Sequence, residues 1–168
     1  MFISIPSVAV HGLEGVRIDV ESDVGAGFGK FFIVGLPDAA INESRHRVKT
    51  AINNSGFNCT TRNITVSLAP ADAKKSGPSF DLPIAVGLIG QRERLNMDVV
   101  DTSIFIGELA LDGMLRPVTS VLPSVLFARD HGFKRVFVPK DNASEAALVP
   151  EIDVIAVEDL MTVIQMIQ

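Results

Sequence analysis

The sequence lacks several residue types on which common binding and structural roles depend. None of its 168 residues is Trp or Tyr, so the amphipathic rings favoured at adaptable binding surfaces are missing. The single cysteine, Cys59, excludes an internal disulfide. No Cys/His cluster has the spacing of a zinc site. We therefore expect a cytoplasmic protein without a structural metal.

Long apolar runs and nucleotide-binding motifs are also missing. No stretch approaches the roughly 20 apolar residues of a membrane span. The apolar start is interrupted at Pro6, so it predicts a strand rather than a signal peptide. No Gly-x4-Gly-Lys-Ser/Thr loop for ATP is found. The glycines from Gly25 to Gly29 precede a strand pattern rather than a helix, which favours a hairpin loop over a dinucleotide site.

The charge and length indicate one mildly acidic domain. The chain has 15 Lys and Arg against 20 Asp and Glu, a balance that does not indicate nucleic-acid binding over the whole surface. Its length suffices for one core, and it holds no repeat or linker, so we predict a single domain over residues 1–168. Most of the ten Phe are expected in that core. The last predicted helix lacks a stop signal, which indicates a piece of a longer protein.

The hydrophobic periodicity predicts alternating strands and helices. Strand patterns lie at 16–21, 30–34, 63–68, 135–138 and 153–157, and helical patterns at 39–56, 80–88, 120–131, 142–148 and 158–167. Asp38 is expected to cap the first helix, and Asp112-Gly113 to form the turn of a hairpin. We also expect 16–21 to pair with 30–34 as a hairpin. The fold class is therefore α/β or α+β, with a mixed sheet and flanking helices.

The stretch from Lys74 to Asp81 is the most informative for chemistry. A Ser at a helix start beside Gly and Pro can expose its hydroxyl, and neighbouring amides can point at an oxyanion. A hydroxyl nucleophile also needs a base. The alternative is that Ser79 or Asp81 only caps the following helix, and the spacing alone favours this alternative.

Basic residues gather on the polar face of the helix after Asp38. Arg45, His46 and Lys49 lie away from its apolar stripe, and Glu43 is within i,i+4 reach of Arg47. A solvated face is the default interpretation. The alternative is a surface that contacts phosphates, formed together with Lys74 and Lys75.

Six short runs spread along the chain form one recognisable pattern. They are FIVGLPDAA (32–40), ESRHRV (43–48), ITVSLAPAD (64–72), FDLPIA (80–85), GEL (107–109) and KRVFVP (134–139). Together they closely resemble the N-terminal domain of the ComM/YifB family, which is often labelled magnesium-chelatase-like. The resemblance covers essentially the whole chain.

The second half of the chain also resembles the proteolytic domain of Lon and the C-terminal domain of RadA. This resemblance implies the fold shared with the second domain of ribosomal protein S5. In Lon-type proteases a Ser in a Gly-Pro-Ser turn works with a Lys near the start of a later helix. Ser79 matches the Ser, but Leu122 stands where the Lys would be. Because a Leu cannot take up a proton, the resemblance implies a broken dyad and no catalytic residues.

The family resemblance also implies a function. Full-length members join this domain to an AAA+ ATPase module, which is absent from this chain, and form hexameric rings that promote DNA branch migration during natural transformation. ATP and magnesium are expected only in that module, and no cofactor in this domain. Our first hypothesis is a non-catalytic assembly and DNA-proximal domain. Its partners would be its own ATPase module, other copies and DNA, but no membrane, and its phosphate contacts would come from Arg45, Lys49, Lys74 and Lys75.

Two other classes of function remain open from the sequence. One is a residual Ser peptidase that uses Ser79 with an unrecognised base, which a fluorophosphonate probe labelling the wild type but not Ser79→Ala would support. The other is a protein-interaction scaffold that never meets DNA, which DNA binding would exclude. Insertion of magnesium into a porphyrin has no support in these residues, because carboxylate clusters and a P-loop are both missing.

Overall fold

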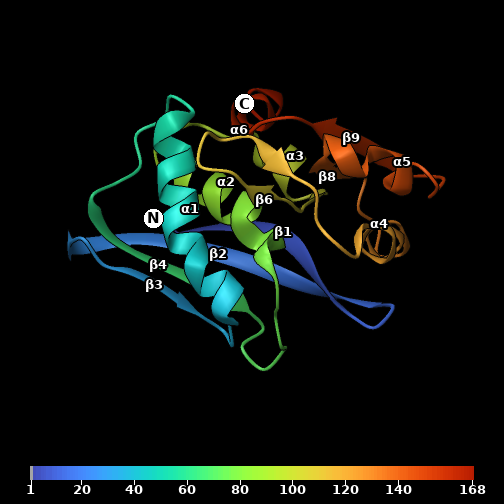
Figure 1. Cartoon of the computed structure of the whole chain (residues 1–168), viewed down its shortest axis with the longest axis horizontal. Helices are drawn as coiled ribbons and strands as arrows, with labels where there is room; N and C mark the ends of the chain where they lie inside the picture. Colours follow the sequence, from blue (N-terminus) through green and yellow to red (C-terminus); the bar gives the residue numbers. More distant parts are fainter. Residues whose placement is uncertain (1) are drawn as a thin grey trace.

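Strands of the computed structural model, which describes residues 2–168, form three sheets (Figure 1). The first has the order β1-β2-β4-β3, from β1 (Phe2–His11), β2 (Glu14–Phe28), β4 (Arg62–Ala69) and β3 (Phe31–Val34). The second is parallel, with the order β5-β8-β9, from β5 (Ser103–Phe105), β8 (Arg135–Pro139) and β9 (Asp153–Val157). The third pairs β6 (Glu108–Leu109) with β7 (Leu115–Arg116). These sheets and their helices confirm the predicted α/β class.

The hairpin expected between 16–21 and 30–34 is wrong. β2 pairs antiparallel with β1 on one side and with β4 on the other, whereas β3 lies parallel to β4 at the far edge. The register of β2 against β4 shifts between Gly25 and Phe28, just before the chain crosses to that edge. The side chains of β4 that face the core, Ile64, Val66 and Leu68, are fully buried. The alternation of apolar and polar residues identified the strands but not which strands pair with one another.

The helices fall close to their predicted positions. They are α1 (Ala39–Asn54), α2 (Asp81–Ile89), α3 (Met97–Val100), α4 (Val121–Asp130), α5 (Ala143–Ala146) and α6 (Leu160–Met166), with 3-10 turns η1 (Pro78–Phe80) and η2 (Lys140–Asn142). Asp38 caps α1 as expected, since its Oδ1 accepts the Ile41 N–H at 2.8 Å. The turn at Asp112-Gly113 also joins an antiparallel pair, β6 and β7. The short helix α3 was not predicted.

Helix α2 lies at the centre of the molecule, between the four-stranded sheet and the parallel sheet (Figure 1). Every residue of α2 is buried, which is typical of a helix that is apolar on all sides. Its cluster includes the stacked rings of Phe105 and Phe137 from the parallel sheet. A second cluster packs α4 against the other face of that sheet, through Val125, Val136 and their neighbours. The parallel sheet is therefore covered on both faces, as such sheets require.

Most Phe side chains lie in or against the core, as expected, because Phe31 and Phe57 pack against the first core cluster and Phe133 against the second, besides the buried ones. Four of the ten are buried, namely Phe80, Phe105, Phe127 and Phe137. Phe28 and Phe32 expose 79% and 50% of their surface beside the edge strand β3. Phe32 points to the face of β3 opposite the buried Ile33, since successive side chains of a strand alternate between its faces. Among residues 2–168, no helix combines the length and apolar character that crossing a bilayer requires.

Candidate functional site

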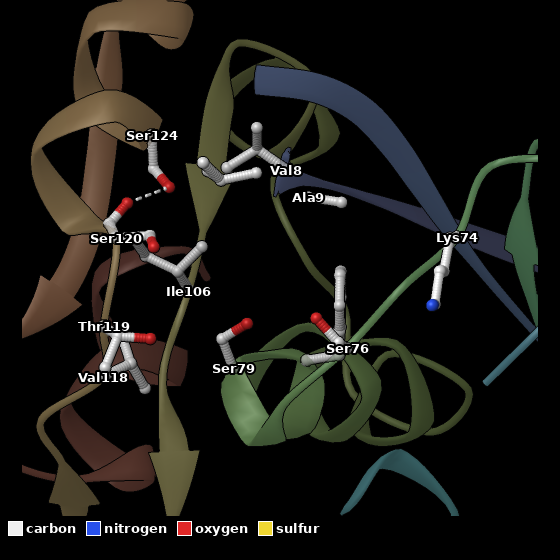
Figure 2. A pocket seen from close by; sticks show the side chains of 12 residues that line it. Val8, Ala9, Lys74, Ser76, Ser79, Ile106, Val118, Thr119, Ser120 and Ser124 are labelled. Atoms are coloured by element: carbon white, nitrogen blue, oxygen red, sulfur yellow. Dashed lines mark hydrogen bonds between the residues drawn. The ribbon is translucent and has the colours of Figure 1, made fainter. Parts of the chain in front are cut away.

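A hollow of about 70 Å³ lies between the start of α2 and the start of α4 (Figure 2). Its polar lining consists mainly of hydroxyl groups, from Ser76, Ser79, Thr119, Ser120 and Ser124, with Lys74 at one side. Its apolar lining comes mostly from β1 and from Ile106 and Val118. The hollow thus brings the Gly-Pro-Ser turn next to Thr119 and Ser120, just before α4, the helix in which the resemblance to Lon-type proteases places Leu122 at the Lys position.

The turn that carries Ser79 is anchored at several points. Gly77 has φ +82° and donates its N–H to Asp38 Oδ2 at 2.9 Å, so the α1 cap also holds this loop. The Ser79 carbonyl accepts the Gly107 N–H at 2.9 Å. The Ser79 hydroxyl has no hydrogen-bond partner within residues 2–168. Both proposed caps are wrong, because α2 begins after Phe80 without any side-chain cap.

The hollow contains no evident base for Ser79. Leu122 is half-buried and packs against the second core cluster, and its N–H donates to Glu145 Oε1 at 3.1 Å. Leu122 does not line the hollow, and neither does any His or carboxylate of residues 2–168. No hydrogen bond joins Lys74 to Ser79, and Figure 2 shows the Lys74 ammonium well apart from the Ser79 hydroxyl. The described lining of the hollow therefore offers hydrogen-bond donors and acceptors, but no His or carboxylate that could take up the Ser79 proton.

Lys75 does not lie on the surface where a phosphate contact was predicted. It exposes only 1% of its surface, and its ammonium donates to the Gly35 carbonyl at 2.7 Å and to the Pro70 carbonyl. Burial lowers the pKa of Lys75, an effect that the charge of Asp72 partly opposes. Because the ammonium is enclosed and already bound to carbonyls, Lys75 is removed from the set of candidate phosphate contacts.

The lowered pKa of Lys75 predicts a pH-dependent contribution to stability. As pH rises towards the ordinary lysine pKa of 10.5, the folded chain releases this proton first, so the unfolded chain binds more protons. The contribution of Lys75 to the free energy of unfolding should therefore rise with pH in that alkaline range. In urea unfolding, the free energy of unfolding of the wild type should rise relative to that of Lys75→Met as pH increases. Lys74→Met controls for losing one charge from the same loop, and a pH-independent Lys75→Met difference would contradict the expectation.

The other three candidate phosphate contacts occupy two elements. Arg45 is half-buried on α1, where its Nε donates to the Asn42 carbonyl at 2.9 Å and its Nη1 to the Phe31 carbonyl at 3.4 Å. Lys49 lies one turn further along α1, and Lys74 is exposed in the loop after β4. Within residues 2–168 none of the three forms an ion pair with a carboxylate.

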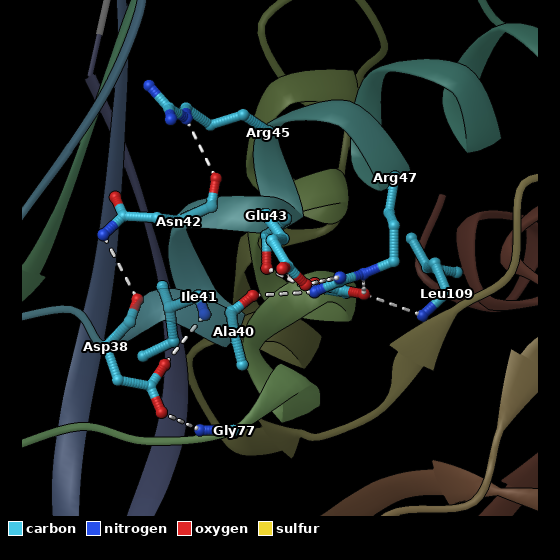
Figure 3. A network of polar contacts seen from close by, with 11 residues as sticks. Asp38, Ala40, Ile41, Asn42, Glu43, Arg45, Arg47, Gly77 and Leu109 are labelled. Atoms are coloured by element: carbon cyan, nitrogen blue, oxygen red, sulfur yellow. Dashed lines mark hydrogen bonds and ion pairs between the residues drawn. The ribbon is translucent and has the colours of Figure 1, made fainter.

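A buried polar network joins α1 to α2 and β6, and sequence reasoning missed it (Figure 3). The Asp81 carboxylate is fully buried and accepts Arg47 Nε at 2.8 Å and Nη2 at 3.2 Å. It also accepts the Leu109 N–H at 3.1 Å and the Ser44 hydroxyl. The predicted Glu43 partner of Arg47 is present at 3.5 Å, but Glu43 is exposed. The Asp81 hydrogen bond is the main cause that raises the pKa of Arg47, against the effect of burial. The signal available in the sequence was a lone carboxylate at the head of an apolar run.

Comparisons with known proteins agree with the pattern of motifs. The family model described as "Subunit ChlI of Mg-chelatase" matches residues 20–142. The chain is 36% identical to the competence protein ComM of Haemophilus influenzae over 159 residues, which are 95% of the chain and 31% of that protein. It is 39% identical to the uncharacterized protein YifB of Escherichia coli over 141 residues, 84% of the chain and 28% of that protein. The chain thus spans about a third of the length of these relatives.

Weaker similarity extends to the two other families identified from the sequence. Lon protease 2 of Bacillus subtilis is 27% identical over 124 residues, which are 72% of the chain and 22% of that protease. The DNA repair protein RadA of Listeria monocytogenes is 33% identical over 92 residues, 55% of the chain and 20% of that protein. The predicted relationship to ComM, YifB, Lon and RadA is confirmed.

Proposed function

The chain belongs to the family described as subunit ChlI of Mg-chelatase, and from this membership we propose that it is a non-catalytic assembly and DNA-proximal domain. The larger protein would be a ComM/YifB-type ATPase of the cytoplasm. Since the relatives are about three times as long, they have room for an AAA+ module that would hold ATP and magnesium. In this proposal six copies form a ring that acts on branched DNA during natural transformation and recombination.

The observation that carries the non-catalytic part is the hollow around Ser79. It retains the hydroxyl, but Leu122 occupies the position of the Lon-type Lys and packs into the core instead. An unassisted Ser hydroxyl is a poor nucleophile near neutral pH. A binding and assembly role does not require an activated nucleophile in the hollow.

The DNA part rests on individual cations without carboxylate partners rather than on total charge. Arg45, Lys49 and Lys74 are cations without carboxylate partners within residues 2–168, in a chain whose net charge is −5. Phosphate contacts release counterions from DNA, and six copies in a ring would add their contacts by avidity. The isolated domain is therefore expected to bind weakly and the ring more tightly.

We expect DNA binding that weakens steeply with salt. Three phosphate contacts correspond to a slope of about −2.7 in log affinity against log salt for duplex arms and about −2.1 for a single strand, which are about 40-fold and about 20-fold losses of affinity between 50 and 200 mM salt. Fluorescence anisotropy with single-stranded and forked DNA measures this, with light scattering to report the mass. The variant Arg45→Gln/Lys49→Gln/Lys74→Gln should reduce both affinity and slope.

A single-charge control is Lys134→Gln, which removes an exposed cation before β8, to be compared with each of the three substitutions made singly. It should leave binding nearly unchanged. A chain that stays monomeric and shows no affinity for either DNA at low salt would contradict the DNA-proximal role.

A further inference from the structure

A second group of cations surrounds a hollow at the opposite end of α2 from Ser79. This hollow of about 190 Å³ lies between the start of β4 and the turn after α2, and it is lined by Val24, Thr60, Arg62, Leu88, Gln91 and Arg92. It differs from the Ser79 hollow in that its charged lining consists of two guanidinium groups.

Neither guanidinium has a carboxylate partner within the described part of the chain. The Arg62 side chain makes no hydrogen bond there, and Arg92 makes one, from Nη1 to the Asn58 carbonyl at 3.5 Å. Among the residues that the structure describes, no carboxylate lines the hollow. Two like charges facing one hollow repel each other, and a bound anion would relieve that repulsion. This arrangement occurs in a chain where acidic residues outnumber basic ones.

The backbone on each side of the hollow is fixed in place. The Arg62 N–H donates to Thr60 Oγ1 at 3.1 Å, and Thr60 is itself buried. On the other side, the Arg92 N–H donates to the Ile89 carbonyl at 2.9 Å, which continues the last turn of α2. The Gln91 amide donates to the Ser22 carbonyl at 3.0 Å. The two arginines therefore extend from a rigid strand end and a rigid helix end.

Further cations continue this surface on both sides. Arg94 lines an adjoining hollow together with Arg92, although Glu93 and Asp101 line that second hollow too. On the α1 side, Lys49 and Arg92 are both close enough to the half-buried Cys59 to affect its thiol electrostatically. Burial raises the pKa of Cys59, and the two positive charges partly oppose this rise. Cations from α1, β4 and the turn after α2 thus lie around one end of the molecule.

We propose that the hollow between Arg62 and Arg92 binds a backbone phosphate of a nucleic-acid strand, with Lys49 and Arg94 contacting neighbouring phosphates. Guanidinium groups suit this role because their planar donors match phosphate oxygens two at a time. The inference rests on the proposed function in that the partner is DNA. It assigns the main contacts to residues that neither the motifs nor the Ser79 hollow indicated.

The test compares Arg62→Gln/Arg92→Gln with a control of equal charge change, Arg116→Gln/Lys134→Gln, whose residues are exposed elsewhere. Anisotropy titrations use labelled single-stranded DNA with the whole chain at several salt concentrations. Losing two phosphate contacts should make the salt slope shallower by about 1.4. At low salt the affinity should fall about tenfold or more, whereas the control should keep most of its affinity and slope. Arg62→Lys/Arg92→Lys retains the charges without the paired donors and should bind with intermediate affinity.

The outcomes separate this inference from the proposed function. If DNA binding is lost in Arg45→Gln/Lys74→Gln but kept in Arg62→Gln/Arg92→Gln, the inference is wrong and the DNA-proximal role stands. If the wild type binds no DNA at low salt, both are wrong. Equal losses in the Arg62/Arg92 variant and its charge control would also overturn the inference, because only total charge would then matter. Circular dichroism and urea midpoints confirm that each variant remains folded.

Discussion

Replacing Asp81 with Ala is expected to lower the free energy of unfolding by about 3 to 5 kcal/mol. The carboxylate is fully buried and accepts hydrogen bonds from Arg47, Ser44 and the Leu109 N–H. Its removal leaves a guanidinium with its main partner gone, and it leaves a buried backbone donor without an acceptor. Urea unfolding followed by circular dichroism measures the loss.

The control for this substitution is Glu43→Ala, which removes the other carboxylate near Arg47. Glu43 is exposed, so its loss should cost less than about 0.5 kcal/mol. Adding Arg47→Met to Asp81→Ala should recover part of the stability, because the uncompensated charge is then gone. Similar small losses for Asp81→Ala and Glu43→Ala would show that the buried network contributes little.

The second large effect is expected at Gly35, where Ala should cost about 3 kcal/mol or more through backbone strain and overpacking. Gly35 has φ +100°, a conformation that residues with a side chain rarely adopt. A Cβ there would lie 2.3 Å from the Leu68 carbonyl oxygen, and Leu68 is fixed in the central strand β4. The Gly35 carbonyl also accepts the Lys75 ammonium, so a shift of this segment would disturb that contact too.

Gly29→Ala is the matched control for Gly35→Ala. Gly29 also has a positive φ, +80°, but a Cβ there would meet no atom within 4 Å. It should therefore show the conformational cost alone, about 1 kcal/mol. The difference between the two free energies of unfolding isolates the clash with β4. Equal losses would mean that the backbone around Gly35 moves freely enough to accommodate a methyl group.

Local sequence signals predicted the helices and strands. Strand order and side-chain pairing depend on long-range contacts, which these local signals do not report. Asp38 marked the start of α1 because a cap acts on residues three positions away. The position of β3 beside β4 was missed, since alternation reports burial and not strand order. Arg47 was paired with Glu43, four residues away, although its stronger partner Asp81 is 34 residues away.

The same contrast applies to the candidate site. The resemblance paired Ser79 with Leu122, but the structure places Thr119, Ser120 and Ser124 around the Ser79 hollow and packs Leu122 against the core. Lys74 and Lys75 are adjacent and identical in type, yet one is exposed and the other enclosed by carbonyls of Gly35 and Pro70. Only the path of the loop distinguishes them. The Arg62 and Arg92 hollow gave no sequence signal, since its residues come from two distant segments.

The central position of α2 limits how the chain could be divided. The helix is buried on every side, and its cluster draws side chains from the four-stranded sheet and from the parallel sheet alike. A piece ending before α2 would expose the parts of the first sheet and of α1 that α2 covers, and a piece beginning with α2 would expose the helix itself. Neither half has a complete interior of its own. The two halves are therefore mutually dependent, and we expect no cut within this chain to yield two autonomous folding units.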